Sequence, residues 1–127
     1  MKILVIDDNK AIRNVLSEFL SEFGNQVITA ADGVNGLEVF RHSGNFDIVF
    51  TDRTMPGGVL GEEVMREIKR LSPKTFVVLM SGDDQKEVIN AGITAGADAI
   101  LCKPFKLAEV DDLINDFFPL FEKEKKG

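Results

Sequence analysis

Phe46-Asp47-Ile48-Val49-Phe50-Thr51-Asp52 is the stretch that decides how the rest of this chain is interpreted. A short apolar run between polar residues predicts a buried strand, and this strand ends on the carboxylate of Asp52. Taken alone, an Asp after a strand is most simply a turn residue or the cap of the next helix.

Two other predicted strands also end on charged residues. Residues 2–6 run directly into Asp7 and Asp8, and residues 99–102 run directly into Lys103. Three carboxylates and one ammonium are therefore delivered from separate strand ends. Capping explains any one of these residues, but it explains the set poorly.

The length and composition of the chain are those of one globular domain. A chain of 127 residues buries roughly two-thirds of its unfolded surface in a single core. We expect a domain over residues 1–121, followed by a charged tail at 122–127. The net charge of -6 argues against a nucleic-acid partner, because phosphate backbones are bound mainly through clustered Lys and Arg.

Cellular location is predicted from two features. The single cysteine, Cys102, lies in an apolar strand and is expected to be buried and inert, which fits a reducing cytoplasm. The apolar start of the chain is cut off by Asp7 and Asp8, so it is too short for a signal peptide or a membrane span. We expect a cytoplasmic protein with no membrane partner.

Strands and helices alternate along the chain. Apolar patterns and turn residues predict strands at 2–6, 26–30, 46–52, 75–80 and 99–102, and helices at about 12–23, 33–43, 61–71, 85–95 and 107–117. The fourth helix is the weakest, because it contains Gly92 and several β-branched residues. The alternation predicts an α/β fold with a parallel sheet covered on both faces, whose ligand site lies at the carboxyl ends of the strands.

Three clustered carboxylates need a cation, because each pair repels by about 4 kcal/mol at ~4 Å for an effective dielectric constant of ~20. An all-oxygen ligand set suits Mg²⁺, or Mn²⁺, and disfavours zinc. A hard cation, the ammonium of Lys103 and the hydroxyl of Ser81 would together bind a phosphoryl group. Asp52 is placed to attack phosphorus and become an aspartyl-phosphate. The structural alternatives are that Asp7, Asp8 or Asn9 caps the first helix, that Ser81 is a turn hydroxyl, and that Lys103 is a solvated charge.

The pattern as a whole resembles the receiver domains of bacterial two-component response regulators, of the chemotaxis-regulator type. The resemblance covers essentially the whole chain and rests on residues 3–8, Asp52 with Met55-Pro56, Ser81-Gly82, Gly96-Ala97-Asp98 and Lys103-Pro104-Phe105. It implies one doubly wound (βα)5 flavodoxin-like domain with strand order 2-1-3-4-5. That order would place Asp7, Asp8 and Asp52 together.

The resemblance also implies a role for each matching residue. Asp52 would be the phosphoacceptor, Asp8 and Asp52 direct Mg²⁺ ligands, Asp7 the partner of a metal-bound water, Thr54 a backbone-carbonyl ligand, Ser81 the phosphoryl-binding hydroxyl and Lys103 the phosphoryl-binding ammonium. A cis Lys103–Pro104 peptide bond is implied as well.

Some positions depart from the family pattern. Ile100 stands where a Tyr, Phe or His ring usually turns inward on phosphorylation, so a ring-flip switch is not available. Arg53 stands where an apolar residue is common, and it either leans over the phosphoryl site or extends into solvent. The loop after Asp52 is one residue longer than usual. Thr54 and Asp83 occupy positions that tune phosphoryl lifetime.

The predicted function is signalling rather than enzymatic turnover, since the chain would catalyse only its own phosphorylation and dephosphorylation. A sensor histidine kinase or phosphotransfer protein would donate the phosphoryl group, and an output partner would bind the fourth helix, fifth strand and fifth helix. Two alternatives stay open. One is a pseudo-receiver. The other is a hydrolase of the haloacid dehalogenase type, but such enzymes carry an Asp-x-Asp motif after the first strand, and Asp7-Asp8-Asn9 does not match it.

His42 is interpreted as a surface residue. Two interpretations stay open for Phe117, Phe118, Leu120 and Phe121: they complete the core, or they contact a partner or a second copy in a homodimer.

Overall fold

The structure is a computed structural model that describes residues 1–55, 60–82 and 86–117. Its elements alternate strictly along the chain. They are β1 (Lys2–Ile6), α1 (Lys10–Glu22), β2 (Gln26–Ala30), α2 (Gly33–Ser43), β3 (Ile48–Asp52), α3 (Gly61–Leu71), β4 (Phe76–Ser81), α4 (Lys86–Thr94), β5 (Ala99–Cys102) and α5 (Leu107–Phe117).

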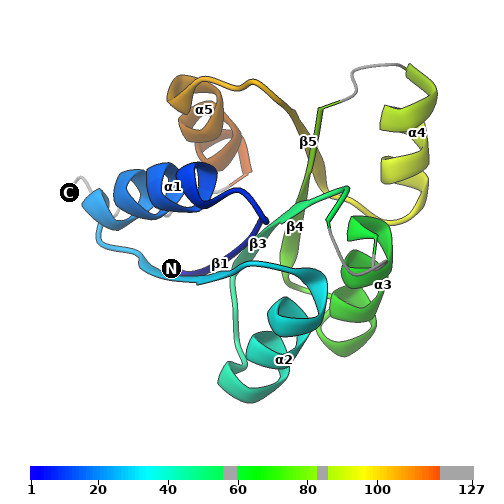
Figure 1. Cartoon of the computed structure of the whole chain (residues 1–127), viewed down its shortest axis with the longest axis horizontal. Helices are drawn as coiled ribbons and strands as arrows, with labels where there is room; N and C mark the ends of the chain where they lie inside the picture. The colour runs from blue at the N-terminus through cyan, green and yellow to red at the C-terminus, as the bar shows by residue number, and fades with distance from the viewer. Residues whose placement is uncertain (56–59, 83–85, 118–127) are drawn as a thin grey trace.

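The strands form one parallel sheet in the order β2-β1-β3-β4-β5. This confirms the predicted doubly wound α/β fold and its strand order. Helices α1 and α5 cover one face of the sheet, and α2, α3 and α4 cover the other (Figure 1). Strand β3 lies at the centre of the sheet, between β1 and β4. Asp52 is the last residue of this central strand.

Two apolar clusters, one on each face, hold the sheet between its helices. Val49 of β3 packs with Phe40 and Ile68 on the face covered by α2 and α3, whereas Phe50 packs with Leu16 and Val110 under α1 and α5. All five residues of β3 are buried. A strand buried on both faces favours a continuous apolar run over alternation, and Ile48–Val49–Phe50 shows this pattern before the polar Thr51 and Asp52.

Element boundaries agree with the predicted ranges to within about two residues. Strand β4 spans Phe76–Ser81 instead of 75–80, because Thr75 belongs to the preceding turn, where its N–H donates to the Ser72 carbonyl at 3.1 Å. Ser81 is the last residue of the strand and pairs with Cys102 of β5. The predicted tail and the side chains of residues 117–121 lie outside the described part of the chain.

Helix α3 begins at Gly61, as predicted, despite the long preceding loop. The Gly61 N–H donates to the Arg53 carbonyl at 2.8 Å, which ties the start of the helix to the end of β3. A Cβ at position 61 would collide with the carbonyl oxygen of Asp52 and lie 2.7 Å from the Cα of Arg53. Only glycine allows this approach between the helix and the strand.

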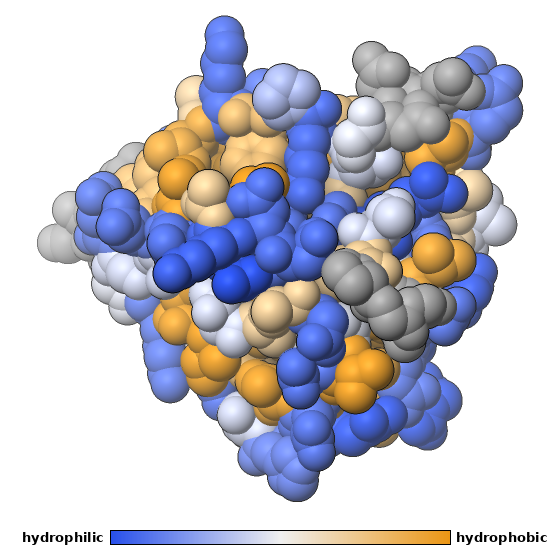
Figure 2. Space-filling model, in the orientation of Figure 1, coloured by the Kyte–Doolittle hydropathy of each residue, from blue (hydrophilic) through white to orange (hydrophobic). Residues whose placement is uncertain are grey.

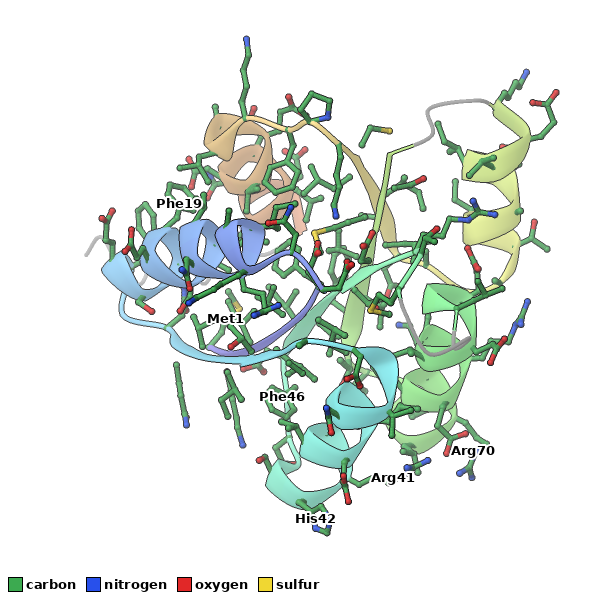
Figure 3. The ribbon with its side chains drawn as sticks, in the orientation of Figure 1. Met1, Phe19, Arg41, His42, Phe46 and Arg70 are labelled. Carbon is green, nitrogen blue, oxygen red and sulfur yellow. The ribbon has the colours of Figure 1, made fainter. Side chains whose placement is uncertain are left out.

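The surface features agree with the sequence with one exception. His42 is exposed and projects from the end of α2, as expected (Figure 3). The prediction that Cys102 is buried is wrong: the thiol is half-buried, because β5 is an edge strand with a neighbour on one side only. Among the described helices, none has the length and apolar composition needed to cross a membrane.

Candidate functional site

In the turn between β1 and α1, the residue that caps the helix is not one of the two acidic residues. Asn9 is the N-cap of α1, and its side-chain oxygen accepts from Ala11 N at 2.9 Å and from Ile12 N at 3.2 Å. The capping alternative therefore applies to Asn9 and not to Asp7 or Asp8. Asp7 is fully buried and accepts a hydrogen bond from Asn9 N at 2.8 Å, whereas Asp8 is exposed.

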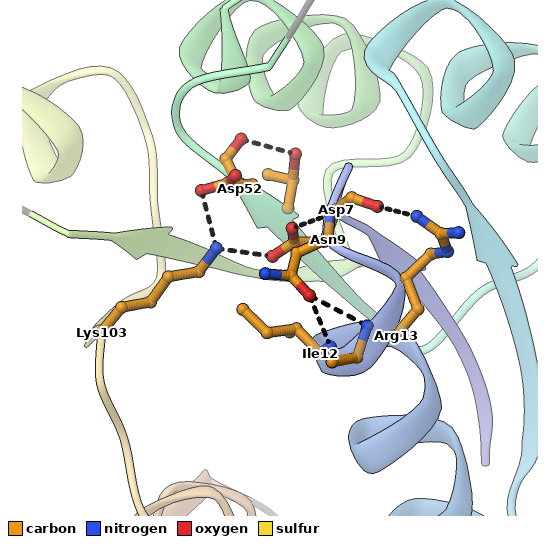
Figure 4. A network of polar contacts seen from close by, with 8 residues as sticks. Asp7, Asn9, Ile12, Arg13, Asp52 and Lys103 are labelled. Atoms are coloured by element: carbon orange, nitrogen blue, oxygen red, sulfur yellow. Dashed lines mark hydrogen bonds and ion pairs between the residues drawn. The ribbon is translucent and has the colours of Figure 1, made fainter.

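Lys103 connects the first, third and fifth strands. Its Nζ lies 2.7 Å from Asp7 Oδ2 and 3.3 Å from Asp52 Oδ1 (Figure 4). The following bond, Lys103–Pro104, is cis, as the family resemblance implied. Lys103 N also donates to the Ser81 carbonyl at 2.7 Å. The interpretation of Lys103 as a merely solvated charge is therefore wrong.

The acidic cluster predicted from the strand ends is present. One carboxylate oxygen from each of Asp7, Asp8 and Asp52 lies within 4.8 Å of the other two. Asp52 is buried, with a side chain only 10% exposed. Burial is the main cause that raises the pKa of Asp52, and the charge of Asp7 adds to it, whereas Lys103 acts in the opposite direction.

The pKa of Lys103 is set by opposing influences. Burial lowers it, but the hydrogen bond to Asp7 and the charges of Asp52 and Asp7 outweigh this effect, so the pKa lies above its usual value. The ammonium is therefore fully charged at neutral pH. It acts as the internal counterion of the two buried carboxylates.

The donor set fits a hard divalent cation. Three carboxylates face one ammonium, so this group of four carries an excess negative charge equal to the charge of one divalent ion. Oxygen donors of this kind suit Mg²⁺ or Mn²⁺. Burial is the main cause of the raised pKa of Asp52, and the charges of Asp7 and Asp8 add a smaller contribution that a bound cation would offset.

The remaining predicted residues lie at the same edge of the sheet. Ser81 is buried at the end of β4, directly after Met80, which pairs with Asp52 in the sheet register. Thr54 is exposed two residues beyond Asp52. Asp83 lies outside the described residues. The topology thus brings Asp7, Asp8, Asp52, Ser81 and Lys103 to one edge.

Two arginines near the site take positions that the sequence did not indicate. Arg13 of α1 donates through Nη1 to the Asp7 carbonyl at 2.7 Å, and its place four residues after the cap Asn9 is the signal that could have found it. Arg53 pairs with Glu62 through Nε at 2.7 Å. Arg53 therefore does not extend freely into solvent, and no short-range spacing predicts a partner across a loop.

Comparison with known proteins agrees with the fold and the site. A five-stranded parallel sheet in the order 2-1-3-4-5, with helices on both faces, defines the flavodoxin-like class of α/β domains. A family model described as the response regulator receiver domain matches residues 3–115. The chain belongs to this family. Receiver domains of two-component systems are in general non-enzymatic signalling domains that bind Mg²⁺ at an acidic cluster.

Individual relatives support the assignment. The chain is 29% identical to sporulation initiation phosphotransferase F of Bacillus subtilis, covering 94% of both chains. It is 34% identical to the transcriptional regulatory protein QseB of Escherichia coli O157:H7, covering 87% of this chain but 49% of the relative. The chain therefore spans about half the length of some relatives. The CheX-CheY-BeF3-Mg+2 complex of Borrelia burgdorferi contains a chain of the same fold, with a TM-score of 0.85, 26% identity and coverage of 93% of this chain and 89% of that one.

Proposed function

We propose that this chain is a phosphoacceptor of the cytoplasm that takes a phosphoryl group onto Asp52 in a Mg²⁺-dependent reaction and thereby changes its affinity for an output partner. The observation that carries this proposal is the contact of Lys103 with both Asp7 and Asp52 beside a third carboxylate, Asp8. One ammonium and a divalent cation supply the positive charge that a phosphoryl group requires.

Each residue has a defined part in the transfer. A carboxylate oxygen of Asp52 attacks phosphorus, the bond from phosphorus to the donor nitrogen of a phosphohistidine breaks, and the imidazole leaves with the electron pair. The product is an acyl phosphate on Asp52. Lys103 neutralises a phosphoryl oxygen and Ser81 donates a hydrogen bond to another. Hydrolysis of the acyl phosphate restores Asp52, so the chain catalyses only its own modification.

The cation would be held by Asp8 and Asp52 directly, by Asp7 through a bound water, and by the backbone carbonyl of Thr54. Bound there, Mg²⁺ would supply positive charge to the phosphoryl oxygens, and Mn²⁺ would suit the same donors.

An open hollow of about 420 Å³ beside Lys103 supports a phosphohistidine-bearing protein as the donor. Its lining includes Ile12 and Val15 of α1 and Phe105 from the loop after β5. Hydrophobic surface between α1 and α5 is visible in Figure 2. A helix that packs its apolar face into this hollow would bring a phosphohistidine to the edge of the sheet where Asp52 lies. The donor would be a sensor histidine kinase or a phosphotransfer protein.

We place the output partner on the face formed by α4, β5 and α5. The observation that supports this is on α4: Ile93 is 54% exposed, an apolar side chain that a partner bound to this helix would cover.

The decisive experiment is incubation with a small phosphodonor, such as acetyl phosphate, and Mg²⁺. We expect an acid-stable, base-labile species one phosphoryl group heavier, which Asp52→Asn abolishes and chelation of Mg²⁺ prevents. The matched control is Asp47→Asn, which changes an exposed carboxylate just before the same strand and should leave the modification intact. Equal modification of wild type and Asp52→Asn would show that another residue is the acceptor. Mg²⁺ binding without modification by any donor would favour the pseudo-receiver alternative.

A further inference from the structure

Arg53 and Glu62 form an ion pair directly beside the proposed phosphoacceptor. Arg53 follows Asp52 in the chain, and its Nε lies 2.7 Å from Glu62 Oε1 in the second residue of α3. The Glu62 side chain is 10% exposed and that of Arg53 is 33% exposed. A buried carboxylate is retained in a protein when it has a partner, and Arg53 is the partner that the described residues supply.

The backbone brings these two side chains together. Gly61 N donates to the Arg53 carbonyl at 2.8 Å, and Arg53 N donates to the Met80 carbonyl at 2.8 Å. The segment between β3 and α3 is thus closed at its base, with Arg53 held at the end of the sheet. Glu62 follows Gly61 and so reaches Arg53 across this closed base.

The charge of Arg53 matters because of where it lies. The acidic cluster of Asp7, Asp8 and Asp52 attracts any cation within reach, and a guanidinium on the residue next to Asp52 competes with a metal ion for it. Glu62 gives this guanidinium a counterion on the α3 side. The net charge of the Arg53–Glu62 pair is therefore close to zero, so the pair competes little with a cation for the acidic cluster.

We propose that Glu62 is a positioning residue for the phosphorylation site: by pairing with Arg53 it keeps the guanidinium away from the acidic cluster, so that the cluster stays available to Mg²⁺. The inference rests on the proposed function only in taking the acidic cluster as the Mg²⁺ site. The inference predicts that Mg²⁺ affinity falls when the charge of Glu62 is removed and does not fall when the charge of Arg53 is removed.

The test is isothermal titration calorimetry of Mg²⁺ into the metal-free protein at low ionic strength. Glu62→Gln keeps a hydrogen-bond acceptor but removes the counterion, and we expect Mg²⁺ affinity to fall about three- to tenfold. Arg53→Met should bind Mg²⁺ at least as tightly as wild type. The double variant Arg53→Met/Glu62→Gln, which leaves no unpaired buried charge, should return to the affinity of the wild type. The deficit of Glu62→Gln should shrink as salt is added.

If the ion pair only stabilised the fold, the Mg²⁺ affinities of the variants would follow a different pattern. In that case both single variants and the double variant would weaken Mg²⁺ binding together, in step with their loss of thermal stability. That outcome, or an unchanged affinity in Glu62→Gln, would overturn the proposal. Arg53→Lys keeps the cation and should behave as wild type, which provides a variant that folds with the pair intact.

Glu67 offers the matched control on the same helix. It pairs with Arg41 at 3.3 Å and with Arg70 at 2.6 Å, and both arginines are labelled along α2 and α3 in Figure 3. Glu67→Gln breaks both of these ion pairs and should leave Mg²⁺ affinity unchanged. A wild-type protein that binds no Mg²⁺ would refute the proposed function itself, whereas normal wild-type binding with unaltered variants refutes this inference alone.

Discussion

Gly92 of α4 lies directly against Ile100 of β5. A Cβ added at Gly92 would lie 3.0 Å from Ile100 Cδ1, and 2.9 Å from Leu79 Cδ2 of β4. Gly92 is the buried residue of α4, and Ile100 packs against the core beneath this helix. The aliphatic side chain at position 100 therefore occupies the space that the glycine leaves, and α4 docks on the sheet through this contact.

Gly92→Ala should lower the free energy of unfolding by about 1 kcal/mol. The added methyl overpacks the contact with Leu79 and Ile100, at a cost of about 1–3 kcal/mol, and the gain in helix propensity of about 1 kcal/mol offsets part of it. Urea unfolding measures the change. Ile100→Val provides room, so Gly92→Ala should cost less in that background. A stabilising effect of Gly92→Ala alone would show that the contact is loose.

Lys103→Met should destabilise the metal-free protein by roughly 2–3 kcal/mol, because it leaves Asp7 and Asp52 without their shared counterion. The raised pKa of Lys103 means that its contribution is present at neutral pH and is lost as the pH rises through this value, above 10.5. Added Mg²⁺ should recover part of the loss, because it binds the folded state. Denaturant titrations with and without Mg²⁺ test this, and equal stability of variant and wild type would contradict it.

Asn9→Ala and Asp8→Ala should separate capping from metal binding. Removal of the cap oxygen of Asn9 should cost about 1 kcal/mol of stability and leave Mg²⁺ affinity nearly unchanged. Asp8 is exposed and does not cap the helix, so Asp8→Ala should leave stability within about 0.5 kcal/mol of wild type while Mg²⁺ binding is lost. Thermal unfolding and calorimetric Mg²⁺ titration measure the two effects independently. The reverse pattern would assign the cap to Asp8.

Asp52→Asn should be more stable than wild type at pH 7 without Mg²⁺. The pKa of Asp52 is raised in the folded state, mainly by burial, so the folded state binds this proton more tightly than the unfolded state does. Stability from this group therefore falls as the pH rises above 3.8, its value without the protein environment. The advantage of Asp52→Asn should disappear below that pH and reverse at saturating Mg²⁺. Thermal unfolding across pH 3 to 7 provides the measurement.

The sheet and its acidic edge were predictable because both depend on patterns along one strand at a time. The apolar run of β3 indicates burial on both faces, and the charged residues that end β1, β3 and β5 indicate a shared edge once the strands are parallel. Strand order is a different matter. It came from the family resemblance, since periodicity says nothing about which strands are neighbours.

The contacts that the sequence did not reveal all cross between elements. The pair of Arg53 and Glu62 depends on the path of the segment after β3, and the fit of Ile100 against Gly92 depends on how α4 lies over the sheet. The half-buried state of Cys102 follows from the place of β5 at the edge. An apolar neighbourhood in the sequence indicates that a residue belongs to a strand, but not whether a second strand covers it.

The contact between Lys103 and Asp7 joins residues 96 positions apart in the chain. During synthesis the three carboxylates emerge well before β5, so an incomplete chain carries the proposed acceptor, Asp52, without the ammonium of Lys103 that balances it. Long-range contacts of this kind form late in folding, because a long loop must close first. If Asp52 is the acceptor, the proposed site is complete only after β5 has joined the sheet, because Lys103 follows that strand.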